Sequence, residues 1–269
     1  MNRLHLFEIQ DFPWCPRSFR DSLTALMRWA IDLLHIYDPI LPQLQTLIAH
    51  APTRRIVDLC AGGAGPWGRL GAALDRRVGI PVPVLLTDKY PNLGAFKRLQ
   101  QQAAGRVDFA AESIDATNVP AHLRGVRTLF SSFHHFPPPL ARQILRDAAE
   151  KGAPIGVFEF TERSLPACLG MLFAPLATLL VVPFLRPFSV GRVLSCMPVP
   201  FLPLMAVWDG LVSNLRTYSP KELDGLAGEI NVPGYCWQSG RIPGGPTRLA
   251  VTYLLGLPEA NASAASAPP

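Results

Sequence analysis

The chain is short of charge and of paired cysteines. Only 17% of its 269 residues are charged, and its five cysteines are scattered, with no CxxC pair. An odd number of dispersed cysteines predicts neither a disulfide framework nor a zinc site. The start of the chain carries Glu8 and Asp11 where a secretory signal needs an apolar core. The sequence therefore predicts a cytoplasmic protein, with a location peripheral to the membrane as the alternative.

Long basic runs and a three-residue glycine period are also missing. The net charge is +5, and the basic pairs at 54–55, 76–77 and 97–98 do not extend into a run. Nucleic-acid binding needs clustered phosphate contacts, so we expect none here. Sparse charge and aperiodic glycine exclude long coiled coils and collagen. What the chain has instead is 49% hydrophobic residues, enough for a large core.

Apolar runs alternate with helical patterns in the middle of the chain. Strands that alternate with helices need crossover connections and form a mostly parallel sheet covered on both faces. The sequence thus predicts an α/β three-layer sandwich in a single domain, 1–258, with a helical N-terminal lid at 1–52 and a disordered tail at 259–269. The predicted strands are 54–60, 82–87, 107–111, 126–130 and 155–160, then 235–239 and 249–255, the last two joined by a turn at 241–247.

A glycine-rich turn follows the first predicted strand. The stretch IVDLCAGGAG, residues 56–65, ends in small residues that let a ligand approach the backbone. The next helix offers free N–H groups and the positive end of its dipole. Asp88 ends the second predicted strand, where an acidic residue reaches ribose hydroxyls, and Asp115 follows the third. Because parallel strands end at one edge of the sheet, these groups predict a ligand site there.

Four segments resemble motifs I to IV of class I, Rossmann-like, S-adenosylmethionine-dependent methyltransferases: VDLCAGGAGPWG, LTDKYPN, SIDATNVP and FSSFHHF. The resemblance covers 53–163 well and 217–257 by pattern. It implies a seven-stranded sheet whose last strand is antiparallel, S-adenosyl-L-methionine as cofactor and methyl transfer as activity. AGGAG stands where GxGxG is commoner, and the absence of GxGxxG makes NAD binding less attractive.

The resemblance also implies roles for the residues of the first two motifs. Asp58, Ala61, Gly62 and Gly63 would line the methionine part of the cofactor. Asp88 would accept hydrogen bonds from the ribose hydroxyls. Two alternatives stay open: Asp58 as a structural carboxylate bonded to loop N–H groups, and Asp88 as a strand-end cap.

Four further residues would surround the adenine. The resemblance places Lys89 and Tyr90 beside it, with the Tyr90 ring available for packing. Asp115 would accept a hydrogen bond from the adenine amino group, and Ala116 would lie next to it.

Two histidines follow the fourth predicted strand. The resemblance places Ser132 and Phe133 beside the sulfonium end of the cofactor, and His134 and His135 toward the substrate. Histidine can act as a general base near neutral pH. Adjacent side chains point apart, so we expect at most one of them to do chemistry; the alternative is a purely structural pair. We expect no metal, because the neighbouring sequence supplies no further ligands.

Residues 164–215 form an apolar insertion. From 164 to 208 the only charged residues are Arg186 and Arg192, and prolines recur. Residues 165–185 are nearly long enough for a transmembrane helix, but the prolines within them would break such a helix. The alternatives are a surface element that dips into a membrane with both arginines at the headgroups, and an apolar cap over the substrate cleft, with or without dimerisation. Its place after the fifth strand favours the cap.

Five residues are candidates for cap or substrate contacts. Asp209 and Arg216 bracket an apolar block, and we expect them to form a buried ion pair that anchors the cap. Alternatively, Asp209 and Tyr218 orient the substrate. Trp14 and Tyr37 are expected in core or lid packing, and the alternative is an aromatic surface for the substrate and the sulfonium.

The sequence therefore predicts an enzyme that methylates an oxygen or nitrogen of an apolar small molecule under a hydrophobic cap. One alternative is non-methyl chemistry on the same fold, such as cyclisation that releases methylthioadenosine. Two others are a membrane-associated lipid or quinone methyltransferase and a non-enzymatic cofactor-binding partner protein. The expected partners are the apolar substrate and, as further options, a membrane surface and a second copy of the chain.

Overall fold

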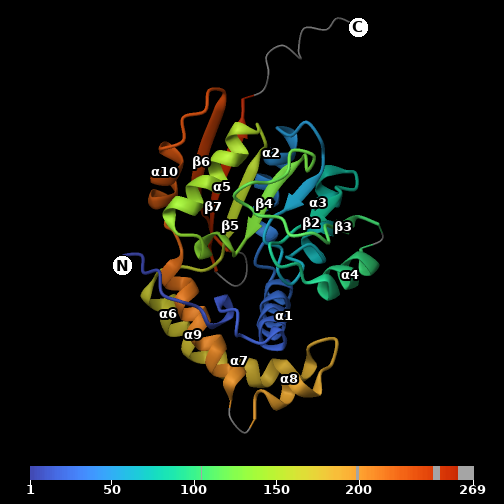
Figure 1. Cartoon of the computed structure of the whole chain (residues 1–269), viewed down its shortest axis with the longest axis vertical. Coiled ribbons are helices and arrows are strands. Elements are labelled where there is room, and N and C mark those ends of the chain that lie inside the picture. The colour runs from blue at the N-terminus through green and yellow to red at the C-terminus, as the bar shows by residue number, and fades with distance from the viewer. Residues whose placement is uncertain (104, 198–199, 245–248, 260–269) are drawn as a thin grey trace, which may run out of the picture.

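The structure, a computed structural model, describes residues 1–103, 105–197, 200–244 and 249–259. Its centre is one seven-stranded sheet with the order β3-β2-β1-β4-β5-β7-β6 (Figure 1). The strands are β1 (Ile56–Asp58), β2 (Val84–Leu86), β3 (Val107–Phe109), β4 (Val126–Phe130), β5 (Ile155–Glu159), β6 (Tyr235–Ile242) and β7 (Val251–Pro258).

The strand directions confirm the predicted sheet. β1 to β5 pair in parallel, and β7 runs antiparallel to both β5 and β6. Five parallel strands with their crossovers bring the carboxyl ends of β1, β2, β4 and β5 to the same edge. The predicted turn at 241–247 lies partly, and the predicted tail at 259–269 almost wholly, outside the described residues.

Helices cover both faces of the sheet because side chains along each strand alternate between two cores. Ile56 of β1 packs in one core with Leu47 and Phe96, whereas Val57 packs in the other with Ile144. The first face carries α2 (Leu41–Ala49), α3 (Arg69–Val78) and α4 (Leu93–Gln102), and the second carries α5 (Pro138–Glu150) and α10 (Pro220–Gly228). The three-layer α/β prediction is confirmed.

The N-terminal 52 residues have two different positions. α2 is a core helix, with Leu44 and Leu47 fully buried against the sheet. α1 (Arg17–Leu33) lies at the carboxyl edge of the strands, between the sheet and an outer group of helices (Figure 1). Only the part of this segment that precedes α2 is placed to cover a site at that edge.

The insertion forms the outer group of helices. It contains α6 (Leu165–Gly170), α7 (Ala174–Val181), α8 (Val190–Leu194) and α9 (Phe201–Arg216), with short 3-10 turns between the first three. These helices lie below the sheet in Figure 1, away from β6 and β7. A third apolar cluster, which includes Leu23 of α1, Val182 and Met205, joins the insertion to α1.

Candidate active site

The turn after β1 contains an unusual concentration of left-handed backbone. Cys60 has φ 58° and Ala64 has φ 85°, and Gly62 and Gly65 are also positive. Left-handed conformations of non-glycine residues are costly and cluster at functional sites. A Cβ on Gly65 would lie only 2.8 Å from Asp58 Oδ2, so glycine lets the turn close over that carboxylate.

Asp58 ends β1 and is 1% exposed. Its Oδ1 accepts a hydrogen bond from Thr128 Oγ1 at 2.7 Å. Its Oδ2 lies beside the Trp67 indole: Oδ2 and Trp67 Nε1 stand 2.8 and 3.3 Å from the position of a Cβ on Gly65. Burial raises the pKa of Asp58 to about 7, against the opposing effects of Thr128 and Trp67.

Two buried carboxyl groups, Asp58 and Asp209, are expected to make the free energy of unfolding decrease as the pH rises. Burial raises the pKa of Asp58 to about 7 and that of Asp209 to about 6. Between pH 5 and 7 the folded chain holds protons that the unfolded chain has released, so the free energy of unfolding decreases, on the order of 3 kcal/mol in total. Urea titrations at both pH values measure it. Asp58→Asn should make the free energy of unfolding less dependent on pH, whereas Asp224→Asn, at an exposed position, should not. A free energy of unfolding that increases from pH 5 to pH 7 would contradict the raised pKa values.

Asp88 connects the ends of β1 and β2. Its Oδ2 accepts from the backbone N–H of Gly62 at 2.8 Å, and its Oδ1 accepts from the N–H of Tyr90 at 2.7 Å. Each carboxylate oxygen keeps a further lone pair. The structure thus places Asp88 against the glycine-rich turn, and the Tyr90 side chain is 79% exposed at the same edge.

Asp115 lies beside this pair of loops. Its Oδ2 accepts from Lys89 Nζ at 2.8 Å, and its Oδ1 accepts from Thr117. The Lys89 ion pair, followed by the Thr117 hydrogen bonds, lowers the pKa of Asp115 to about 2. Both oxygens are engaged, so a contact with an adenine amino group would add to these bonds or replace Lys89. Ala116 is buried in the core.

Glu159 organises the turn after β4, and the sequence analysis missed it. This buried residue ends β5, and its Oε1 accepts from the backbone N–H groups of Ser132 and Phe133 at 3.1 and 2.8 Å. Its Oε2 lies 2.6 Å from His134 Nδ1. Burial raises the pKa of Glu159, but His134 and the N–H donors outweigh it and lower that pKa. Glu159 therefore fixes both the turn and the histidine ring.

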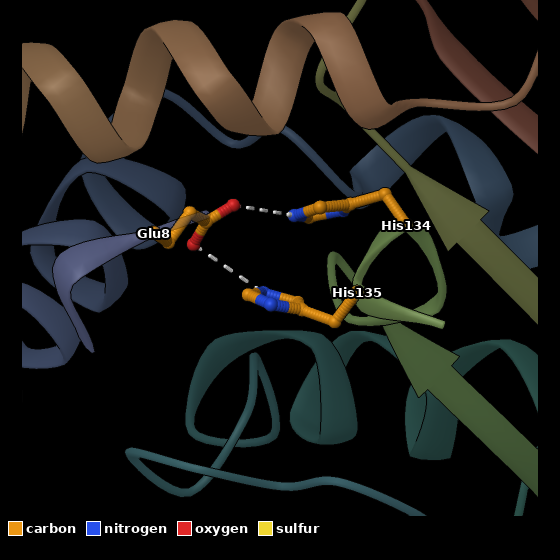
Figure 2. Close-up of side chains that lie close together, drawn as sticks. All are labelled: Glu8, His134 and His135. Carbon is orange, nitrogen blue, oxygen red and sulfur yellow. Dashed lines mark ion pairs between the residues drawn. The ribbon is translucent and has the colours of Figure 1, made fainter. Parts of the chain in front are cut away.

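The two histidines face a third residue from the other end of the chain. Figure 2 shows Glu8 beside the two imidazoles, with one carboxylate oxygen directed to each ring. The expectation that the two histidine side chains point apart is wrong, because their ring centroids lie 4.4 Å apart. Glu8 Oε1 lies 3.8 Å from His134 Nε2, and Glu8 Oε2 lies 3.7 Å from His135 Nε2. Glu8 is fully buried, and His134 Nε2 is buried without a hydrogen-bond partner in the described part of the chain.

The two ring environments differ. The Nδ1 of His135 lies 3.2 Å from Asp11 Oδ1. Burial alone would lower the pKa of His135, but the Glu8 charge and Asp11 outweigh it and raise that pKa. His135 thus lies between Glu8 and Asp11, whereas the Nδ1 of His134 is held by Glu159 and its Nε2 points to Glu8.

The prediction of an ion pair between Asp209 and Arg216 is wrong. Both side chains are buried, but Arg216 Nη1 lies 2.8 Å from Asp11 Oδ2 and 3.4 Å from Glu8 Oε1. Asp209 instead accepts from the N–H groups of Ile9 and Gln10 at 2.7 and 3.1 Å. Asp209 and Arg216 therefore both anchor the N-terminal segment. Their partners in that segment lie closer to them than they lie to each other.

Tyr218 and Tyr37 are both buried. The Tyr218 hydroxyl donates to the carbonyl of Phe136, and its ring carries the Arg3 guanidinium at 3.9 Å. The Tyr37 hydroxyl lies 2.7 Å from Ser131 Oγ, and its ring packs edge-on against Phe130. Tyr37 is thus in the core, the favoured of its two interpretations.

Trp14 is 63% exposed and stacks on Phe12. Phe12 packs on Phe7, which packs on Trp208 of α9, so this aromatic cluster joins the N-terminal segment to the insertion.

The edge of the sheet is closed by the N-terminal segment. Arg3 donates to the carbonyls of His134 and Phe136, and Thr24 of α1 lies 3.1 Å from where a Cβ on Gly63 would stand. Two clefts of about 350 and 250 Å³ lie elsewhere, one at Arg241 and the other between α1 and α3. His134 is 2% exposed beneath this segment.

Three functional candidates were missed, and each had a weak signal. Glu159 is an acid at the end of an otherwise apolar strand. Glu8 and Asp11 were used only to exclude a signal peptide. The expectation of no metal rested on the lack of nearby ligands, and that premise was wrong: one ligand atom from each of Glu8, His134 and His135 lies within 4.8 Å of the others.

No protein-family profile and no curated protein sequence matches the chain. Solved structures do. The O-methyltransferase NcsB1 from neocarzinostatin biosynthesis, in complex with S-adenosylmethionine and 2-hydroxy-5-methyl naphthoic acid, has a TM-score of 0.53 at 18% identity, over 93% of this chain and 59% of its own. LaPhzM has a TM-score of 0.52 at 15% identity, over 93% of this chain and 60% of its own. An O-methyltransferase family protein from Burkholderia thailandensis has a TM-score of 0.50 at 18% identity, over 87% of this chain and 59% of its own.

The chain spans about three fifths of the length of these proteins. At such low identity the likeness concerns architecture, and it agrees with the strand order and the covered faces described above. The chain has the fold of the class I S-adenosylmethionine-dependent O-methyltransferases.

Proposed function

We propose that the chain is an S-adenosylmethionine-dependent methyltransferase that methylates a hydroxyl group of an apolar small molecule. One observation carries this proposal: two buried polar atoms on the turn after β4, Ser132 Oγ and His134 Nε2, have no hydrogen-bond partner among the described residues. Buried polar groups are normally satisfied, so two such atoms on one turn support a ligand there. Ligands of open α/β sheets bind at this edge.

The residues at this edge fit the cofactor. Asp58 and the small residues of the glycine-rich turn would hold its methionine part. The remaining lone pairs of the Asp88 carboxylate would accept hydrogen bonds from its ribose hydroxyls. When bound, S-adenosylmethionine supplies an electrophilic methyl group on its sulfonium. The protein then has to orient the acceptor, exclude water and remove a proton.

His134 is the proposed general base. Glu159 accepts its Nδ1–H, which leaves the Nε2 lone pair for the proton of the acceptor hydroxyl. Glu159 and Glu8 then stabilise the imidazolium. A base suits a hydroxyl acceptor, and the similar proteins NcsB1 and that of Burkholderia thailandensis are named O-methyltransferases. Residues 3–11 would exclude water once they close over the histidine.

A metal ion is the competing role for Glu8, His134 and His135. The Arg216 guanidinium lies 3.4 Å from Glu8 Oε1 and 3.3 Å from His135 Nδ1, and this fixed positive charge opposes a divalent cation. The base assignment therefore fits better. Chelation followed by dialysis is expected to leave turnover unchanged; loss of turnover together with one equivalent of released metal would overturn it.

The by-product tests the function. The purified chain, residues 1–269, is incubated with S-adenosylmethionine and a panel of apolar phenols and hydroxynaphthoic acids, and the nucleoside product is identified by mass spectrometry. Adenosylhomocysteine with a methylated acceptor supports methyl transfer. Methylthioadenosine would identify non-methyl chemistry, and calorimetric binding without turnover on any acceptor would identify a cofactor-binding partner protein.

Asp88→Ala is expected to weaken S-adenosylmethionine binding by about tenfold or more, the loss of charge-assisted hydrogen bonds to the ribose. Isothermal titration calorimetry measures it. Asp88→Asn keeps one acceptor oxygen and should lose less, and exposed Glu112→Ala serves as the control at the same edge. Unchanged affinity in Asp88→Ala would remove Asp88 from the cofactor site.

A further inference from the structure

The outer face of the insertion is apolar and turned to solvent. Leu165–Phe184 is long and apolar enough to cross a membrane, with a mean hydropathy of 2.2, yet only 11% of it is buried. The large exposed side chains on this face include Leu172, Phe173, Leu176, Leu180, Phe184 and Leu194. A contiguous exposed apolar surface marks an interaction site. We call the exposed part of 165–197 the outer face.

The opposite side of this segment is fixed to the body of the protein. Val182 and Leu185 are buried in a cluster with Leu202 and Met205 of α9. The Asn214 side chain donates to the carbonyl of Ala167 and accepts from the N–H of Glu162. The helices are thus held along their length while their outer side chains have no partner among the described residues.

The charge around the outer face is positive. No acidic residue occurs from 164 to 208, and the only charged residues there are Arg186 and Arg192. Arg186 is exposed. Arg192 is half-buried, and its Nε donates to Ser22 Oγ of α1, on the inner side of the insertion. An apolar face beside an exposed cationic group is complementary to an anionic lipid surface. A symmetric second copy would instead bring like charges together.

The anchoring contacts favour a position in the plane of the interface. α9 packs along α7, and it carries Asp209, which is 3% exposed and bound to the backbone of the N-terminal segment. A hairpin of these helices across a bilayer would take Asp209 and Glu8 into hydrocarbon, which is expensive. With the segment lying flat, only its outer side chains enter the lipid.

We propose that the outer face binds the surface of an anionic lipid bilayer peripherally, with Leu172, Phe173 and Phe184 in the acyl boundary and Arg186 at the phosphate level. The proposal is independent of the methyltransferase assignment, because membrane binding needs neither cofactor nor acceptor.

Vesicle flotation of the chain, residues 1–269, tests this proposal. The chain is expected to float with vesicles of phosphatidylcholine and phosphatidylglycerol, and to partition about tenfold less into phosphatidylcholine alone. Phe173→Glu and Phe184→Glu should each lower partition by about tenfold or more, because each loses a large buried apolar group. Ile80→Glu, on a similarly apolar exposed residue outside the outer face, is the matched control.

The arginine is tested separately. Arg186→Glu should lower binding to the anionic vesicles and leave binding to neutral vesicles unchanged, whereas exposed Arg76→Glu should change neither. Since these side chains are exposed, unfolding curves and calorimetric cofactor binding of the variants are expected to match the parent chain, which separates membrane binding from folding and from the proposed function.

Three results would overturn the proposal. The first is that the chain stays at the bottom of the gradient and does not float with either vesicle type. The second is that the chain forms a dimer without lipid and that Phe173→Glu dissociates this dimer, which would identify a second copy as the occupant. The third is that alkaline carbonate fails to extract the chain from vesicles, which would identify a membrane-spanning segment.

Discussion

His134→Ala is expected to lower the turnover of the proposed methyl transfer by about 100-fold or more, the usual contribution of a positioned general base. The reason is geometric: the Nδ1 of His134 is bound to Glu159 at 2.6 Å, and its buried Nε2 has no partner in the described structure. Steady-state kinetics with the acceptor found in the by-product assay measure the effect. Cofactor affinity by calorimetry is expected to stay unchanged, because the proposed role of His134 is toward the acceptor.

His135→Ala is the matched control for this prediction. Both ring nitrogens of His135 face carboxylates, Nε2 facing Glu8 and Nδ1 facing Asp11, and neither lies on the unpartnered side of the turn, so we expect a loss below about fivefold. Added imidazole should restore part of the turnover of His134→Ala and none in His135→Ala. Equal and mild losses in the two variants would dismiss both histidines as the base.

Arg216→Met is expected to lower the free energy of unfolding by about 3 kcal/mol or more. Arg216 is buried, and its guanidinium contacts Asp11 at 2.8 Å and Glu8, which is fully buried, at 3.4 Å. Removing it leaves Glu8 without its permanent positive partner, and an uncompensated buried charge is strongly destabilising. Urea unfolding followed by fluorescence measures the change, with exposed Arg76→Met as the control.

The double variant Glu8→Gln with Arg216→Met separates the pair from other effects of Arg216. Since removal of both charges leaves neither uncompensated, the double variant should lose less than the sum of the single losses, by about 1 kcal/mol or more. Additive losses, or a single loss in Arg216→Met below about 1 kcal/mol, would show that the pair does not hold the N-terminal segment in place.

The local parts of the site followed from sequence. Alternating apolar runs and a glycine-rich turn are properties of a few neighbouring residues, so the strand ends at Asp58, Asp88 and the histidine turn were predictable. The observed sheet has the expected seven strands and the expected antiparallel strand. The expected ion pair failed because the choice of partner by a buried charge depends on which segments the fold brings near.

The sequence by itself determined the α/β sheet, the edge at which its loops gather and the apolar character of 164–208, because strand periodicity, glycine backbone freedom and composition act locally. Only the tertiary structure decided that Glu8 and Glu159 meet His134, residues that lie 126 and 25 positions from it. It also decided which side of the insertion is exposed, since α9 and α1 cover one side and leave the other to solvent.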